Sequence, residues 1–181
     1  NPNFSTSGLS ALVAQAYAAN GKTADLSIED LAKPSTAEFA RGVESAVVHY
    51  GDITMTFLNN WFRADQRGNP FGYVSAVAVE EKSVIDYNRG DPDGVLQEGE
   101  EPRPPRVPLV AIYPEEGTVY SDTPLYVLDA DWVDDAEAEA AAAFVEFVKL
   151  PQNQEKGPQF GFRPGNLHVP IDEPINAEDR A

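Results

Sequence analysis

The chain has 181 residues, and its 13 basic and 30 acidic side chains give it a net charge of −17 at pH 7. This charge disfavours nucleic acids and anionic membranes as partners, because both carry negative phosphate groups. The absence of cysteine excludes disulfides, thiolate metal sites and cysteine nucleophiles. With 42% hydrophobic residues, the composition supports a folded core in one domain, or in one domain plus a piece of another.

The first part of the chain predicts a series of helices. Hydroxyls at residues 5–7 can cap a first helix, which carries one apolar stripe from Leu9 to Tyr17 and ends at residues 20–21. Ser27, followed by Asp30, predicts a short second helix that runs up to residue 34.

Two further helices are expected before residue 70. Ser35 and Glu38 have the spacing of a capping box, and the inner face of that helix would run from Phe39 to Tyr50. Asp52 can cap the next helix, which turns Ile53, Phe57 and Trp61 to one side.

The apolar pattern then changes. Residues 73–79 predict a largely buried strand, residues 81–88 a short helix, and residues 108–113 and 124–128 two more strands. The acidic, Pro-rich stretch between them, residues 90–108, is typical of a solvated surface excursion. Asp134 caps a final helix with an inner face of Ala140, Phe144, Phe147 and Val148, and Pro151 ends it. Beyond Pro170 an acidic tail is expected to fray.

Strands separated by helices predict an α/β protein with a mixed or parallel sheet. Only two or three strands stand against six helical patterns, so either strands are missed or the chain is part of a larger fold.

The strongest candidate for a binding site is the start of the first helix, at Ser5, Thr6, Ser7 and Gly8. Hydroxyls and unpaired backbone N–H groups converge there, and the helix dipole adds a partial positive charge, so the site suits an anion or a polar ligand. The alternative, plain helix capping, is favoured on these residues alone.

Other candidates follow the predicted helices and strands. His49 and Tyr50 precede a glycine turn and can face a cleft, although a lone histidine is a weak metal signal. Glu80, Glu81 and Ser83 follow the first strand and can orient a cation, an amine or sugar hydroxyls, or simply begin a helix. The loop from Tyr113 to Thr118 follows the second strand, or is a simple turn.

Several chemistries are disfavoured by the residues present. The acidic cluster at 129–135 lacks the glycine of a calcium loop, since Val133 and Asp134 stand at the wrong positions. We therefore expect no metal and no cofactor. A hydrolase with Glu80 or Glu81 as general base lacks an accompanying nucleophile, metal site or second acid.

Several stretches together resemble bacterial extracellular solute-binding proteins of the type II periplasmic-binding fold. The resemblance is strongest to the actinobacterial branch whose solute-binding region precedes a von Willebrand factor A domain. It covers residues 1 to about 168, and its segments are NPNFSTSGLSALVAQAY (1–17), GVESAVVHYGD (42–52), AVAVEEKSVIDYNRG (76–90), VAIYPEEGTVYSDTPLYVLDADWV (110–133) and AAAFVEFVKLPQNQEKGPQFGFRPGN (141–166).

The resemblance implies a three-layer αβα lobe, incomplete relative to the two-lobed family. Residues 1–128 would form the second lobe, residues 129–168 the C-terminal return helices, and residues 169–181 the acidic tail. The missing first lobe would leave the closing helix without its usual surface, so Phe144, Phe147 and Val148 predict a homodimer through that helix.

The expected function is non-catalytic binding of a small polar or anionic solute in a cleft between lobes. The resemblance implies a secreted or cell-surface bacterial protein, exported by a signal that this chain does not carry. The alternative is a protein-interaction module of a surface assembly that uses the same fold without a small ligand. The residues expected to contact the solute are Ser5, Thr6, Ser7, Gly8, His49, Tyr50, Glu81, Ser83, Tyr113 and Thr118.

Overall fold

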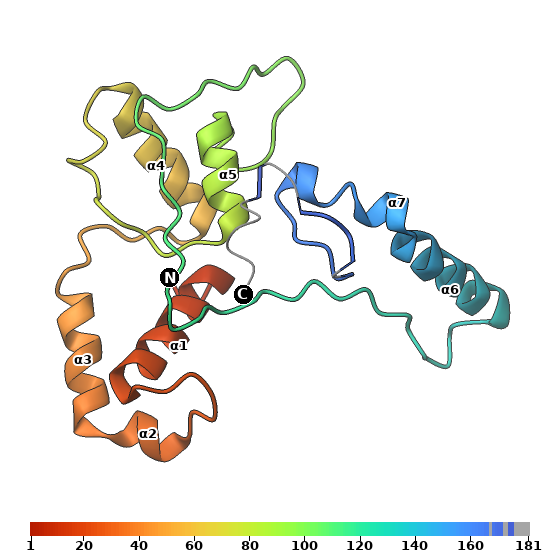
Figure 1. Cartoon of the computed structure of the whole chain (residues 1–181), viewed down its shortest axis with the longest axis horizontal. Helices are drawn as coiled ribbons and strands as arrows, with labels where there is room; N and C mark the ends of the chain where they lie inside the picture. Colours follow the sequence, from red (N-terminus) through yellow and green to blue (C-terminus); the bar gives the residue numbers. More distant parts are fainter. Residues whose placement is uncertain (167, 172–173, 176–181) are drawn as a thin grey trace. The chain divides into compact units, whose positions relative to one another are not determined.

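The computed structural model describes residues 1–166, 168–171 and 174–175 (Figure 1). The chain divides into two compact units, Asn1–Val119 and Tyr120–Ala181. Within the described residues both units consist of helices and irregular segments, with no strand and no sheet. The expected three-layer α/β fold is therefore wrong.

Three helices pack together at the beginning of the first unit: α1 (Thr6–Asn20), α2 (Ile28–Ala32) and α3 (Pro34–Glu44) (Figure 1). The predicted caps of the first two are confirmed, because the Ser5 side chain accepts from the Gly8 N–H and Ser27 forms a capping box with Asp30. The predicted apolar stripe of α1 is not buried: Leu9 and Leu12 keep 50% and 44% of their surface exposed.

The third helix differs from its prediction at both ends. It begins with Pro34 in its first turn, where a missing N–H costs nothing, and no side chain caps it. The predicted capping box of Ser35 and Glu38 is therefore wrong. Since the helix ends at Glu44, the expected inner face does not continue to Tyr50.

The core of the first unit lies between α4 (Thr54–Gln66) and α5 (Glu81–Arg89). Leu58, Trp61 and Tyr87 are buried there, and the Trp61 ring N–H donates to the Pro70 carbonyl at 3.1 Å. The predicted cap of α4 is wrong, because Ile53 and not Asp52 precedes its first turn. The side chains that complete this core are Phe57, Phe62, Tyr73, Val74, Val77 and Leu109.

Burial leaves one polar group of this core without a hydrogen bond. The Tyr87 hydroxyl has no partner among the described residues, and the side chain is fully buried. Burial, and secondarily the charge of Asp65, raise the pKa of Tyr87 to about 12. Tyr87 therefore stays neutral throughout the physiological pH range.

The three predicted strands are irregular segments with no partner strand. Residues 73–79 are apolar because Tyr73, Val74 and Val77 pack on the helical core. At residues 108–113 the backbone is hydrogen-bonded by the Asn88 side chain and not by a neighbouring strand. The Asn88 amide group donates to the Leu109 carbonyl at 2.9 Å, and its oxygen accepts from the Leu109 N–H at 2.7 Å. The next three side chains, at residues 110–112, are exposed, and Ile112 is 87% exposed.

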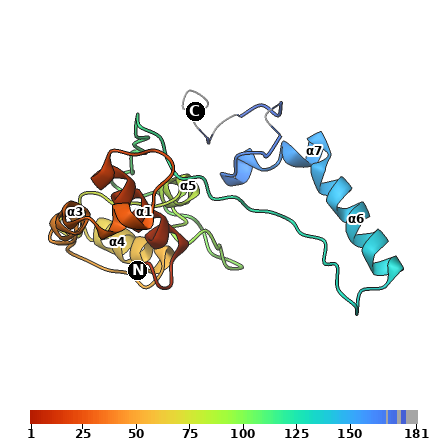
Figure 2. The same cartoon turned by 90° about the horizontal axis from the view of Figure 1, so that it is seen from below.

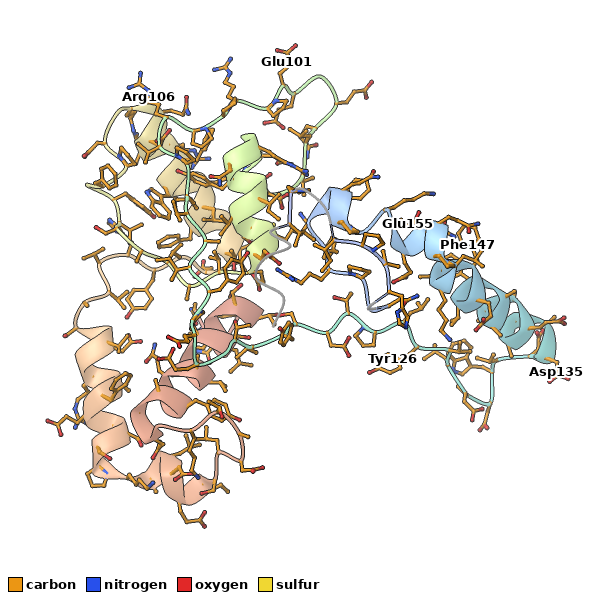
Figure 3. The ribbon with its side chains drawn as sticks, viewed as in Figure 1. Glu101, Arg106, Tyr126, Asp135, Phe147 and Glu155 are labelled. Carbon is orange, nitrogen blue, oxygen red and sulfur yellow. The ribbon has the colours of Figure 1, made fainter. Side chains whose placement is uncertain are left out.

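Several contacts attach the excursion between α5 and Leu109 to the rest of the first unit. At its start, the Gly90 carbonyl accepts from the Arg103 N–H at 3.4 Å, and a Cβ on Gly90 would lie 2.2 Å from the Arg103 carbonyl oxygen. At its end, the fully buried carboxylate of Asp65 on α4 accepts from the N–H groups of Arg106 at 2.7 Å and Val107 at 2.9 Å. Figure 3 labels Arg106 on this segment.

The second unit contains α6 (Asp135–Lys149), α7 (Pro151–Gln154) and a short 3₁₀ helix at Pro158–Phe160 (Figure 2). The predicted cap of α6 is confirmed, since Asp134 forms a capping box with Glu137. No residue of α6 is buried. Phe144 and Phe147 are each 55% exposed, and the partly shielded side is instead Ala138, Ala141, Val145 and Val148.

The tail expected after Pro170 lies largely outside the described residues. No helix among the described residues has the length and apolar character needed to cross a membrane.

Candidate functional site

A cavity of about 140 Å³ lies at the start of α1, within the first unit. Three separate stretches of the chain line it: the first eight residues, the loop that leads into α4, and the segment before α5. Its lining side chains and backbone come from Asn1, Ser5, Ser7, Gly8, His49, Tyr50, Gly51, Ile53, Thr54, Phe57, Ala78 and Val79. Five of the residues predicted to contact a solute thus meet around one hollow.

The polar wall of this cavity is a connected set of hydroxyls that ends at a carboxylate. The Ser7 hydroxyl lies 2.6 Å from both carboxylate oxygens of Glu80 and 2.7 Å from the Thr54 hydroxyl. The Thr54 hydroxyl lies 3.3 Å from that of Ser5, which accepts from the Gly8 N–H at 3.2 Å. Ser7 is only 9% exposed, whereas Ser5, Thr54 and Glu80 are partly exposed. We call Ser5, Ser7, Thr54 and Glu80 the hydroxyl chain.

The first turn of α1 places these groups. Ser5 is extended and caps the helix, so its hydroxyl and that of Ser7 both lie near the helix start. Gly8 is required because a Cβ there would come within 2.9 Å of the Asn1 backbone. Glu80 precedes the first turn of α5, and its carboxylate supplies the negative charge that the start of α1 favours.

Aromatic side chains also line the cavity. His49, Tyr50 and Phe57 contribute to its lining. The His49 ring stacks on the Tyr73 ring with centroids 4.2 Å apart, which holds the imidazole in place. The hydrogen bond that the Tyr50 hydroxyl donates to Glu44 raises the pKa of Tyr50.

The remaining predicted contact residues lie outside the lining of the cavity. Thr6 is exposed on α1, and Thr118 is exposed on an irregular segment. The Ser83 hydroxyl reaches the Glu80 carboxylate at 3.5 Å, and Glu81 accepts a hydrogen bond from the Tyr113 hydroxyl. Glu81 and Tyr113 therefore stabilise each other, and Glu81 directly follows Glu80, the last member of the hydroxyl chain.

Some residues of the site were not among the predicted contacts. The chief ones are Thr54 and Glu80, which complete the hydroxyl chain. In the sequence, these two residues could have been recognised only from their positions, because Thr54 follows a glycine turn and Glu80 follows an apolar run. The apolar lining residues Ile53, Phe57, Ala78 and Val79 carried no signal, because such residues are equally common in a core.

The described residues hold no group of three or more acidic or histidine side chains suited to a metal ion. A pair of aspartates lies at the start of the excursion, where burial raises the pKa of Asp91 and a hydrogen bond from Asn59 lowers the pKa of Asp93. Asn59 donates to Asp93 at 2.9 Å, so this pair is a structural hydrogen-bonded turn.

Chemically, the Ser7–Glu80 pair has the distance of a nucleophile and a base. A carboxylate is nonetheless a weak base for a serine hydroxyl unless its pKa is raised towards neutrality. A histidine normally takes that role, but His49 stacks on Tyr73 instead.

Comparison with protein-family models, with curated proteins and with solved structures gives no match to this chain.

Proposed function

We propose that the first unit binds a small polar solute, without catalysis, in the cavity at the start of α1. The observation that carries this proposal is the convergence of three separate stretches of chain on one hollow. The first two stretches supply hydroxyl groups, the second also supplies aromatic side chains, and the third supplies Ala78 and Val79. Cavities of this kind, apolar in part and with a few convergent polar groups, are the usual sites of small ligands.

The hydroxyl chain favours binding over a purely structural role. A helix cap needs one hydroxyl, and Ser5 provides it. Ser7 and Thr54 are additional, and both line the cavity while bonded to each other. Hydroxyls held in this way are preorganised, which lowers the entropic cost of binding.

The test is an amide chemical-shift titration of the isotopically labelled chain. Methylguanidinium, glycerol, acetate and phosphate serve as probes, and the Gly8 and Gly51 amide signals report on the cavity. We expect at least one probe to shift both signals saturably, and Ser7→Ala to weaken that probe about tenfold through the loss of one hydrogen bond. Ser121→Ala, an exposed serine of the second unit, is the control and should bind normally. Unshifted signals with all four probes would refute the proposal.

A second candidate function, self-association, is favoured by the surface of α6. Phe144 and Phe147 stack with centroids 6.4 Å apart while both remain exposed. The helix begins with Asp135 and Glu137, and Lys149 at its end lies 3.3 Å from Glu146; in two antiparallel copies each Lys149 would approach the acidic start of the other helix. Figure 3 labels Asp135 and Phe147 near the two ends of this helix.

This second proposal is that the occupant of the α6 surface is a second copy of the chain. Multi-angle light scattering at micromolar concentration is expected to give a dimer, which Phe147→Glu converts to a monomer. Phe160→Glu, at an exposed phenylalanine outside α6, is the control. A monomeric unmodified chain would contradict the proposal.

A further inference from the structure

A second hollow lies at the end of α4 and shares no lining residue with the cavity at the start of α1. Its volume is about 360 Å³, within the usual range of small-molecule sites. The residues that line it are Ala64, Arg67, Asn69, Gly72 and Tyr73. The polar side chains among them are a guanidinium, an amide and a phenol, and all three carry N–H or O–H donors.

Two glycines shape the turn that forms one side of this hollow. Gly68 has a φ of +83°, a left-handed conformation in which the chain reverses directly after α4. At Gly72 a Cβ would lie 2.3 Å from the Asn69 side chain, so a glycine is needed for that amide to keep its place. The turn that carries Arg67 and Asn69 therefore has a defined geometry.

A second guanidinium reaches the same turn from a distant part of the sequence. The backbone N–H of Arg106 donates to the buried Asp65 carboxylate at 2.7 Å, which fixes this residue beside the end of α4 (Figure 3). Its Nη1 atom lies 3.2 Å from the position that a Cβ on Gly68 would occupy. Because Gly68 stands between Arg67 and Asn69, the Arg106 guanidinium lies at the edge of the hollow.

The fold does not use either guanidinium. Within the described part of the chain, the side chains of Arg67 and Arg106 form no ion pair and donate no hydrogen bond, although the chain has 30 acidic residues. Capping of α4 does not require them either, because the carbonyls of residues 63–65 accept from the backbone N–H groups of residues 67–69 at 2.7–3.3 Å. Both side chains therefore retain their donors for a ligand.

The local charge favours an anion. Residues 63–69 carry two arginines and one aspartate, and Arg106 adds a third positive charge. Together these exceed the charge of Asp65 and the partial negative charge at the end of α4. The net charge of −17 repels anions over long distances, but physiological salt screens charges beyond about 8 Å. Contacts within the hollow then decide the affinity.

We infer that this hollow binds a phosphate monoester, with the phosphate group held by Arg67 and Arg106. Guanidinium groups bind phosphate through paired N–H donors, and two of them match its two negative charges. The hollow is larger than a phosphate group, so the organic part of the ligand would lie against Ala64, Gly72 and Tyr73. This inference does not depend on the solute proposed for the cavity at the start of α1.

The test compares two probes that share a phenyl ring and differ in their anionic group. The labelled chain in 150 mM NaCl is titrated with phenyl phosphate or phenylacetate at pH 7.5, where a phosphate monoester is a dianion. We expect phenyl phosphate to shift the Gly68 and Gly72 amide signals saturably, and phenylacetate to bind about tenfold more weakly. Equal or tighter binding of phenylacetate would overturn the phosphate, and unshifted signals with phenyl phosphate would overturn the site.

Three charge-matched variants test the two guanidinium groups. Arg67→Gln and Arg106→Gln each remove one charge-assisted contact, and we expect each to weaken phenyl phosphate about tenfold. Arg106→Gln keeps the backbone N–H that bonds to Asp65, so the segment stays anchored. Arg41→Gln, at an exposed arginine of α3, removes the same charge and should bind as the unmodified chain does. Equal binding by all three variants would overturn the inference.

Discussion

Asp65 is expected to be the most sensitive polar position of the first unit. Its carboxylate is fully buried at the end of α4 and accepts from the N–H groups of Arg106 and Val107 at 2.7 and 2.9 Å. Asp65→Ala removes both acceptors at once. Hydrogen bonds to a charged group each contribute about 1.5–3 kcal/mol. Because the freed N–H groups lie near solvent, the lower value applies, and the free energy of unfolding should fall by about 3 kcal/mol.

Urea denaturation followed by tryptophan fluorescence measures this loss, since Trp61 lies on the same helix. With a slope of about 2 kcal/mol per molar urea, the midpoint should drop by about 1.5 M. Asp65→Asn keeps one acceptor oxygen and should lose about half as much. Asp122→Ala, an exposed aspartate of the second unit, is the control and should stay within about 0.5 kcal/mol. A midpoint for Asp65→Ala that equals the control would refute the anchoring role.

Three further predictions concern stability. Hydrogen bonds from Lys22 and Lys33 hold the pKa of Asp30 well below 3.8. The ionised Asp30 side chain therefore stabilises the fold above pH 3.8, and this stabilisation is lost as the pH falls through the lowered pKa of the folded state. Asp30→Asn should therefore be less stable than the unmodified chain at pH 7, and the two melting curves should converge in acid; a constant difference would contradict this. Leu58→Ala, at a position 1% exposed, should cost about 3 kcal/mol in chemical denaturation, whereas Leu125→Ala, half exposed, should cost little. Asn88→Ala should speed hydrogen exchange at the Leu109 amide without unfolding α5, and unchanged protection there would show that another group holds this segment.

Local signals in the sequence predicted the helices best. Ser5, Ser27 and Asp134 were recognisable as caps because a hydroxyl or carboxylate stands at the right distance before a helical stretch. Asp52 and Ser35 have the same chemistry but fail as caps, since the backbone enters those helices at Ile53 and Pro34. The choice among neighbouring caps depends on the path of the preceding loop, which short-range pattern does not encode.

The strands were predicted wrongly because a short apolar run indicates that its side chains pack against something, but not whether they pack in a sheet or on helices. Val74 and Val77 pack against the core cluster that contains Trp61 and Tyr87. Packing on a helical core requires apolar side chains just as packing in a sheet does. Leu109 obtains its backbone partners from the Asn88 side chain. A single side chain that hydrogen-bonds to the backbone in this way produces no periodic pattern in the sequence.

The candidate site was partly predictable for a related reason. Ser5, Ser7 and Gly8 are adjacent in the chain, so their convergence at a helix start is a local event. The approach of Glu80, 73 positions after Ser7, depends on tertiary packing. Sequence reasoning identified the hydroxyls and the acid separately, and the structure places them in contact.

The contact between Gly90 and Arg103 has a consequence for engineering. The two residues close a loop in which residues 91–93 are partly buried and residues 94–102 are all exposed. A loop closed at its base in this way is an Ω-loop, and its tip can lengthen at little entropic cost while the base stays fixed. An epitope tag inserted at Gly99 should therefore leave the helical unit folded, and a protease supplied in trace amounts should cut there first.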